Sequence, residues 1–121
     1  VFSGIISLEN NGGFSSVRCR SKKLNVSGFS KIVLSLNGDG KRYQFRVKRD
    51  VNEKHSYVSY FTTSGAWETI EIPFKDLQPK FRGKYLELKN FSANSIEEFG
   101  FLFGNKQAES FELTIDDIAL L

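Results

Sequence analysis

Few side chains in this sequence have the chemistry that catalysis requires. The single histidine, His55, lies in the polar segment 52–56, and the single cysteine is Cys19. A serine or cysteine nucleophile needs a base, usually histidine, that a third group orients. Nothing near His55 in the sequence suggests activation, so we interpret it as a solvated loop residue. Cys19 cannot form an internal disulfide, and its alternation with two arginines indicates a small, inward-facing core residue.

Paired carboxylates are a second source of chemistry, because two of them can cleave a glycosidic bond. The adjacent pairs are Glu97-Glu98 and Asp116-Asp117. Neighbouring residues on a strand point to opposite faces, so neither pair converges on one bond by itself, although pairing across strands stays open. The sequence has no cluster of cysteine and histidine and no EF-hand loop. It therefore predicts no enzyme, no metal centre and no cofactor.

Glycine-rich segments in this chain indicate tight turns. Residues 38–41 read Gly-Asp-Gly-Lys, which lacks the spacing and the following helix of a phosphate-binding loop. Asn and Gly adopt positive φ readily, as hairpin turns require. We expect one hairpin at Asn10-Asn11-Gly12-Gly13, between the runs 2–8 and 14–20, and a second hairpin at 37–40.

Short runs with the period of a strand must position these residues. Alternation is clearest at 42–48, where Tyr43, Phe45 and Val47 face one way and the polar residues between them face the other. The expected strands are 2–9, 13–20, 31–37, 42–49, 57–62, 67–73, 84–89, 99–104 and 110–120, with single helical turns at 74–77 and 95–99. Many short strands with little helix favour an all-β sandwich or barrel.

Two rows of polar residues alternate with inward-facing residues on these expected strands. Arg18 and Arg20 share one face of the second strand, and Arg42, Gln44 and Arg46 share one face of the fourth. A guanidinium group matches a carboxylate as a planar fork and stacks on aromatic rings. If both rows lie on one open face of a sandwich, they form a cationic groove. The alternative is a charged surface that only interacts with solvent.

Charge is distributed unevenly along the chain. Residues 1–60 contain 11 basic and 4 acidic residues, whereas residues 61–121 contain 6 basic and 10 acidic residues. This division is typical of a molecule with one basic and one acidic face. The basic run 18–23 belongs to no recognised nucleic-acid motif and the net charge is only +3, so we expect no nucleic-acid partner. No apolar run is long enough for membrane insertion, and the lack of a disulfide framework favours a cytoplasmic location.

A series of short motifs covers nearly the whole chain. They are Leu8 to Arg18, Gly38 to Phe45, Trp67 to Phe74, Phe81-Arg82-Gly83, Ile96 to Phe103 and Phe111 to Asp116. In this order they resemble the complex I (NADH:ubiquinone oxidoreductase) intermediate-associated protein family, and the chain is similar to its bacterial members. The resemblance implies a jelly-roll β-sandwich similar to galactose-binding domains and carbohydrate-binding modules. Mitochondrial members act as assembly factors, or chaperones, of a respiratory complex.

The beginning of the chain departs from this family pattern. Relatives carry an earlier strand and a loop reading Asp-x-Val-Met-Gly-Gly-x-Ser, whereas this chain begins at Val1 and contains no methionine. We therefore expect one β-sandwich domain over residues 1–121 that lacks its N-terminal segment. Modules of similar fold often hold a structural calcium ion. Asp116 or Asp117 with a main-chain carbonyl would serve that purpose, as an alternative to our prediction of no metal.

Two binding functions follow from these observations. The first is a non-catalytic module that binds or assembles a protein partner, and the alternative is a carbohydrate-binding module that holds an oligosaccharide on a concave sheet face. Tyr57, Tyr60 and Trp67 are candidate stacking platforms. The predicted binding residues are Arg18, Arg20, Arg42, Gln44, Arg46, Tyr57, Trp67 and Arg82. Arg18 and Arg82 also have a structural alternative, in which they hold main-chain carbonyls or a carboxylate across the sandwich.

Overall fold

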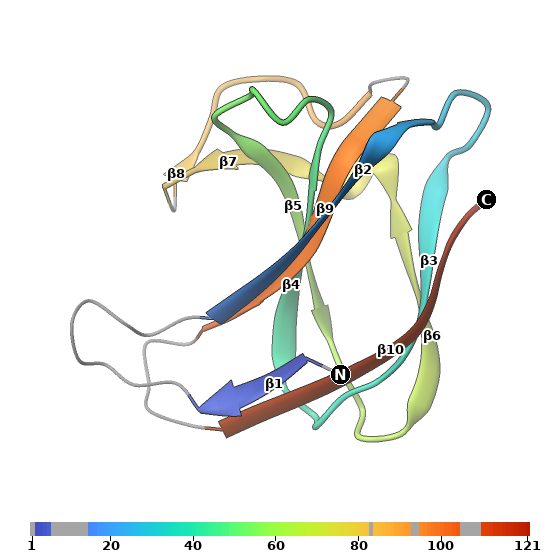
Figure 1. Ribbon diagram of the computed structural model, residues 1–121, viewed down its shortest axis with the longest axis vertical. Coiled ribbons are helices and arrows are strands. Elements are labelled where there is room, and N and C mark those ends of the chain that lie inside the picture. The colour runs from blue at the N-terminus through green and yellow to red at the C-terminus, as the bar shows by residue number, and fades with distance from the viewer. Residues whose placement is uncertain (1, 6–14, 83, 93–94, 105–109) are drawn as a thin grey trace.

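Two antiparallel β-sheets pack face to face (Figure 1). The structure is a computed structural model that describes residues 2–5, 15–82, 84–92, 95–104 and 110–121, and it describes side chains from residue 24 onward. The first sheet has four strands, in the order β1 (Phe2–Ile5), β10 (Ser110–Leu120), β3 (Lys31–Asn37) and β6 (Trp67–Pro73). The second has six strands, in the order β2 (Ser15–Asn25), β9 (Ser95–Phe103), β4 (Arg42–Lys48), β5 (Ser56–Thr62), β7 (Gln78–Phe81) and β8 (Lys84–Tyr85). The predicted all-β sandwich is confirmed, and the described residues include no α-helix.

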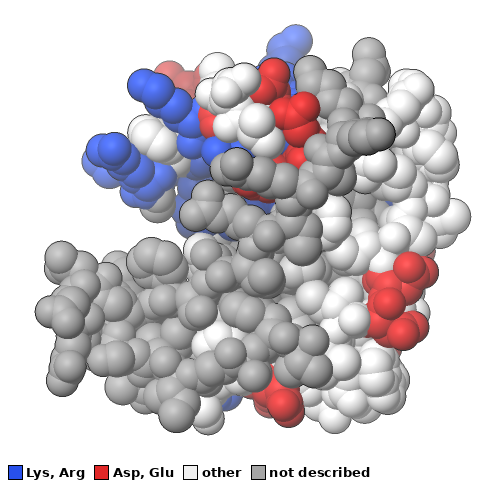
Figure 2. Space-filling view, in the orientation of Figure 1, with Lys and Arg blue, Asp and Glu red and all other residues white. Residues whose placement is uncertain are grey.

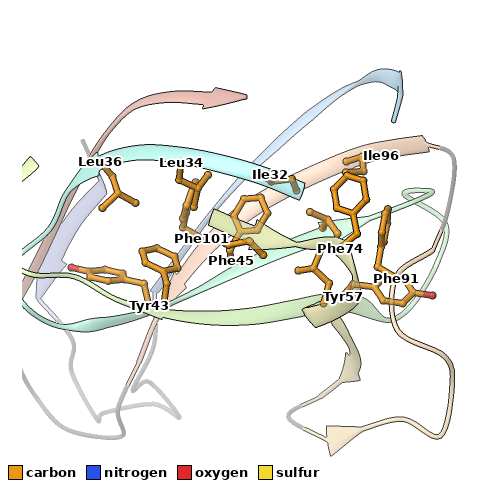
Figure 3. Close-up of a cluster of buried hydrophobic side chains, with 14 of the residues drawn as sticks. Ile32, Leu34, Leu36, Tyr43, Phe45, Tyr57, Phe74, Phe91, Ile96 and Phe101 are labelled. Atoms are coloured by element: carbon orange, nitrogen blue, oxygen red, sulfur yellow. The ribbon is translucent and has the colours of Figure 1, made fainter. Parts of the chain in front are cut away.

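The core lies between the two sheets and follows the alternation that the sequence predicts. On β3 and β4 every second residue is buried. The inward residues of these two strands are Ile32, Leu34, Leu36, Tyr43, Phe45 and Val47, each with at most 2% of its surface exposed. Figure 3 shows these side chains, with others from β5 and β9, filling the space between the sheets. Period-two patterning therefore decides which face of each strand forms the core.

Aromatic rings join the two sheets at one end of the core. Phe103 of β9 stacks on Phe111 of β10, with ring centroids 4.7 Å apart, and Tyr43 of β4 lies 5.1 Å from Phe103. Farther along, Phe45 contacts Phe101 at 5.3 Å. Such offset and tilted arrangements are the preferred geometries of aromatic pairs. The high phenylalanine content of the chain is therefore used largely to hold the sandwich together.

The two turn-rich segments connect strands of opposite sheets, so both hairpin predictions are wrong. β1 pairs with β10 and β2 pairs with β9, while the turn residues 10–13 lie outside the described residues. β3 and β4, which flank residues 38–41, also belong to different sheets. Asn and Gly allow a sharp change of direction, but burial of apolar faces decides which strand pairs with which. Turn chemistry alone therefore does not distinguish a hairpin from a crossover between sheets.

Asp39 ties the crossover between β3 and β4 to the start of β10. The Tyr43 hydroxyl donates a hydrogen bond to Asp39 Oδ1 at 2.9 Å, and the Glu112 backbone N–H donates one to Asp39 Oδ2 at 2.8 Å. Burial, followed by the hydrogen bond to Asp39, raises the pKa of Tyr43 above its ordinary range. The tyrosine therefore stays a hydrogen-bond donor at all physiological pH values.

Three elements near the end of the chain differ from the sequence-based expectations. β9 begins at Ser95, so residues 95–99 form a strand and no helical turn. β7 was not expected, and the predicted strand 84–89 is reduced to the two residues of β8. The helical turn expected at 74–77 is present as the 3-10 helix η2 (Phe74–Asp76). Such short strands have too few residues to show a clear period, which explains why β7 was not predicted and β8 was predicted too long.

Candidate binding face

The outer surface of the six-stranded sheet carries the polar side of β4. In the strand register, Gln44 lies opposite Tyr60 of β5 and Arg46 lies opposite Gly100 of β9. We call this surface the cationic face; its described members are Arg42, Gln44, Arg46 and Lys48 on β4, Val58 and Tyr60 on β5, Gln78 and Lys80 on β7, Tyr85 on β8, and Glu98, Gly100 and Leu102 on β9. Figure 2 shows Lys and Arg side chains gathered over the β7–β8 end of this sheet.

Two members of the cationic face other than Gly100 are buried although they lie on the side away from the main core. Val58 is 2% exposed and Glu98 is 5% exposed. Glu98 lies opposite Lys48 in the register, which places its carboxylate beside a cationic strand position. The Lys48 ammonium group donates a hydrogen bond at 2.8 Å to the main-chain oxygen of Glu53. The long side chains of this face therefore form a packed layer of their own over the sheet.

The backbone register relates the first arginine row to the second. Arg18 lies opposite Gly100 and Arg20 lies opposite Glu98, both across the β2–β9 ladder. Because Gly100 is also opposite Arg46, positions 18 and 46 are on the same side of the sheet, separated by a residue without a side chain. The side chains of Arg18 and Arg20 themselves, like that of Cys19, lie outside the described residues.

Tyr60 is the centre of a compact group on the cationic face. The Arg42 guanidinium carbon lies over its ring, 3.9 Å from the centroid. The Lys80 ammonium donates a hydrogen bond to the Tyr60 hydroxyl oxygen at 2.8 Å and lies 5.3 Å from the same centroid and 5.0 Å from that of Tyr85. We call Arg42, Tyr60, Lys80 and Tyr85 the Tyr60 cluster. Two cations thus share one aromatic ring, an arrangement stabilised by the ring quadrupole.

Gln44 lies beside this cluster and has an unusual amide. Its side-chain oxygen is buried, and no hydrogen-bond donor among the described residues reaches it. A buried acceptor without a partner costs about 1–3 kcal/mol of desolvation. The Gln44 amide is therefore a point of unmet hydrogen-bonding capacity next to Tyr60, its partner in the register.

Two of the three aromatic residues predicted as stacking platforms do not join the cationic face. Tyr57 is only 3% exposed and points into the core, where its ring meets Phe91 edge-on at 5.3 Å (Figure 3). Trp67 is 59% exposed but begins β6, in the four-stranded sheet. Tyr57 therefore offers no surface for a ligand, and Trp67 belongs to a different part of the molecule.

Arg82 lies at the turn between β7 and β8, at the rim of the cationic face. Its backbone has φ of 50°, the one positive value found at a non-glycine position among the described residues. The guanidinium carbon is 5.1 Å from the Phe81 ring centroid. Among the residues that the structure describes, Arg82 has no ion-pair partner, so the cross-sandwich carboxylate of the structural alternative is not found there.

His55 is packed against Tyr57 and Glu53, contrary to the prediction of a solvated loop residue. Its side chain is 16% exposed, and Nε2 lies 3.3 Å from the Tyr57 hydroxyl and 3.5 Å from Glu53 Oε2. Arg49 donates two hydrogen bonds to the Glu53 carboxylate, which holds the pKa of Glu53 below its ordinary value. The spacing of four residues between Arg49 and Glu53 is the sequence feature that could have indicated this ion pair. The pair, together with His55, stabilises the loop between β4 and β5.

The described residues bring together no set of side chains typical of a metal centre, since no three of their His, Cys, Asp or Glu side chains come together as a metal-binding group. Asp116 and Asp117 lie at an irregularity in the β10–β3 ladder, and both are exposed. Among the described residues, no helix has the length and apolar character needed to cross a membrane.

The sequence of the chain matches a known protein family. A family model described as complex I intermediate-associated protein 30 (CIA30) matches residues 1–115. The chain belongs to this family. The resemblance inferred from the short motifs is therefore confirmed, because the match extends from the first strand to the inward residues of β10.

Solved structures share the fold of this CIA30-family chain. A family 11 carbohydrate-binding module from Clostridium thermocellum, in complex with a β-1,3-1,4-mixed-linked tetrasaccharide, superposes with a TM-score of 0.69 at 18% identity, over 99% of this chain and 81% of the module. A family 11 module of the cellulosomal cellulase Lic26A-Cel5E from the same organism has a TM-score of 0.69 at 17% identity, over 99% and 80%. At such identities the likeness shows the fold alone, and it confirms the jelly-roll β-sandwich.

Proposed function

We propose that this chain is a non-catalytic binding module that docks a protein partner on the cationic face, as an assembly factor would. The observation that carries the proposal is the row of Arg42, Gln44 and Arg46 on one outer face of a sheet, continued by the Tyr60 cluster. Arginine and aromatic residues are both enriched at protein interfaces. Membership of a family named for its association with complex I intermediates supports a protein as the partner.

Binding rather than catalysis is also supported by what the matched proteins are called. The family name describes association with an intermediate, and the matched modules are described as carbohydrate-binding. His55, the one histidine, is engaged with Glu53 and Tyr57. We therefore assign no reaction to this chain and place its function in recognition.

Affinity capture from the native cell with charge-reversed variants tests the proposal. The Arg42→Glu/Arg46→Glu double variant should lose a partner that the unmodified protein enriches. The control Lys75→Glu, a reversal at an exposed lysine of η2, should retain it. Binding should then be reproduced with the purified partner. Equal capture by both variants, with matched melting temperatures, would contradict a docking role for the cationic face.

An oligosaccharide on the same face is the second candidate function. It is favoured by the fold shared with a module that was solved with a bound tetrasaccharide. A glycan array probed with the unmodified protein and the same double variant tests it. Specific glycan binding that the double variant loses would support this candidate, and a negative array for the folded protein would remove it.

A further inference from the structure

We propose that the Tyr60 cluster binds carboxylate side chains of an acidic, extended peptide segment. The inference rests on the proposed function, because it names the part of a protein partner that the cationic face takes. It is specific to Arg42, Tyr60 and Lys80, and does not depend on the arginine positions of β2.

Three hydrogen-bond donors of the cluster are available to an anion. Arg42 uses the face of its guanidinium to stack on Tyr60, which leaves the N–H groups at its edge for a ligand. Lys80 donates to the Tyr60 hydroxyl oxygen, so the hydroxyl hydrogen is free to point elsewhere. Each cationic group lies within 5.3 Å of the same ring centroid. Carboxylates at positions i and i+2 of an extended peptide, about 7 Å apart, are spaced to reach both.

The charges of the cluster have no acidic partner in the described part of the chain. Lys31 and Arg49 are paired there with Glu71 and Glu53, whereas neither Arg42 nor Lys80 has a carboxylate at ion-pair distance. Arg82, at the adjoining β7–β8 turn, adds a further exposed cation. Two like charges held at one ring repel each other, so an anion between them is stabilised beyond its contact with either alone.

The geometry favours a carboxylate over a neutral sugar. A sugar ring stacks on an open aromatic face, but the Arg42 guanidinium covers a face of Tyr60 at 3.9 Å. Tyr85 is 54% exposed, and the Lys80 ammonium lies 5.0 Å from its ring centroid. The other exposed platform predicted from the sequence, Trp67, is in the opposite sheet. Charge complementarity is therefore the main recognition available at this site.

A peptide titration tests the inference. The probe is a synthetic peptide of about eight residues with alternating Glu and Ser, and the matched control peptide carries Gln in place of Glu. Titration calorimetry and amide chemical-shift mapping are done in about 50 mM salt, where screening is modest. The Glu peptide should bind and perturb residues of β4, β5 and β7, whereas the Gln peptide should not bind. Raising the salt concentration should weaken the binding.

Neutral substitutions identify the groups responsible. Arg42→Gln and Lys80→Gln should each weaken binding of the Glu peptide by about tenfold, the usual effect of losing a charge-assisted hydrogen bond. Lys75→Gln should leave it unchanged. All three variants should stay folded, and the two cluster variants should lose no more stability than the modest contact of one cation with the Tyr60 ring provides.

Four results would overturn the inference. The first three are that the Glu peptide does not bind, that both cluster variants still bind it, and that the perturbed residues lie outside the cluster. The fourth is that trigalacturonate, a saccharide that carries carboxylates, binds more tightly than the Glu peptide, which would assign the site to a saccharide. The proposed function fails separately. If capture of the partner depends on Arg42 and Arg46 while the peptide does not bind, the module still docks a protein, through other chemistry.

Discussion

Gly38 illustrates how one residue constrains the crossover between the sheets. A Cβ atom at this position would lie 2.3 Å from Thr63 Cγ2, closer than two carbon atoms can approach. Thr63 has little freedom to move, because its hydroxyl donates to the Lys41 carbonyl oxygen at 2.8 Å and accepts from the Gly40 N–H at 2.9 Å. Glycine is therefore required at position 38 for space.

The substitution Gly38→Ala should lower the free energy of unfolding by about 1–3 kcal/mol, the range for overpacking a filled site. Urea denaturation measures it. The matched control is Gly65→Ala, where φ is +85° and no atom lies within 4 Å of the added Cβ. At position 65 the substitution should lower the free energy of unfolding only through left-handed backbone strain, by about 1–2 kcal/mol. Complete restoration of the Gly38→Ala loss by a further change at Thr63 would confirm the contact, and no loss would refute it.

Single-residue predictions succeeded where the period of a strand decided the outcome. Arg42, Gln44 and Arg46 lie on the outer face as the alternation requires. The same alternation on β5 places Tyr57 inside, opposite Val47, so its prediction as a binding residue did not follow the period of its own strand. His55 was misjudged because its partners, Glu53 and Tyr57, are brought to it by a loop that has no period to interpret.

The loop between β4 and β5 shows an element held by charge. Arg49 and Glu53 are half-buried and joined by two hydrogen bonds, and the Arg49 guanidinium also lies 5.2 Å from the Tyr57 ring centroid. Because the folded-state pKa of Glu53 is lowered, its contribution to stability is fully present above its ordinary value of 4.5. That contribution is lost as the pH falls through the lowered pKa.

Urea unfolding measured between about pH 3 and pH 7 tests this linkage. The unmodified protein should lose stability on acidification more steeply than Arg49→Met, in which the pKa of Glu53 returns toward its ordinary value. Arg82→Met serves as the control, because Arg82 has no carboxylate partner within the described residues. Parallel pH profiles for the unmodified protein and Arg49→Met would show that the ion pair does not contribute.

At the scale of elements, the strands themselves were easier to predict than their pairing. β3, β6 and β10 have the predicted boundaries, because each combines a clear period with flanking turn residues. The partners of β1 and β2 were wrong, since pairing depends on contacts between residues far apart in sequence. The choice of a jelly roll over other sandwiches followed from the family resemblance and not from any local pattern.

At the scale of the whole molecule, a layer of buried aromatic and aliphatic side chains holds the two sheets together. Phe45 is fully buried and contacts Phe101 within the core, whereas Trp67 is mostly exposed on an edge strand. The uneven charge along the chain is not divided cleanly between the two sheets, because the cationic face also contains Lys80 and Glu98 from the second half of the chain. Arg42 and Lys80 lie on the outer side of one sheet, and Glu71 and Asp117 lie on strands of the other.

Two aromatic-to-alanine substitutions compare the contribution of a buried ring with that of an exposed ring. Phe45→Ala should reduce the free energy of unfolding by about 3–5 kcal/mol, because it removes a buried ring and leaves a cavity between the sheets. Trp67→Ala should change it by less than about 0.5 kcal/mol, as surface substitutions usually do. Chemical denaturation of both variants provides the comparison. A loss at Trp67 as large as that at Phe45 would mean that the tryptophan is covered in solution.

The pairing of β1 with β10 has a consequence for how the chain is made. These two strands lie at opposite ends of the described sequence, and β10 also provides the partner of β3. During translation, the apolar face of β3 therefore emerges long before β10, its neighbour in the four-stranded sheet, and that of β4 emerges long before β9, its neighbour in the six-stranded sheet. The nascent chain must wait, with those faces uncovered, until residue 120 has left the ribosome. A domain of this topology acquires its structure late, and it is most exposed to aggregation and to chaperones before β10 has been synthesised.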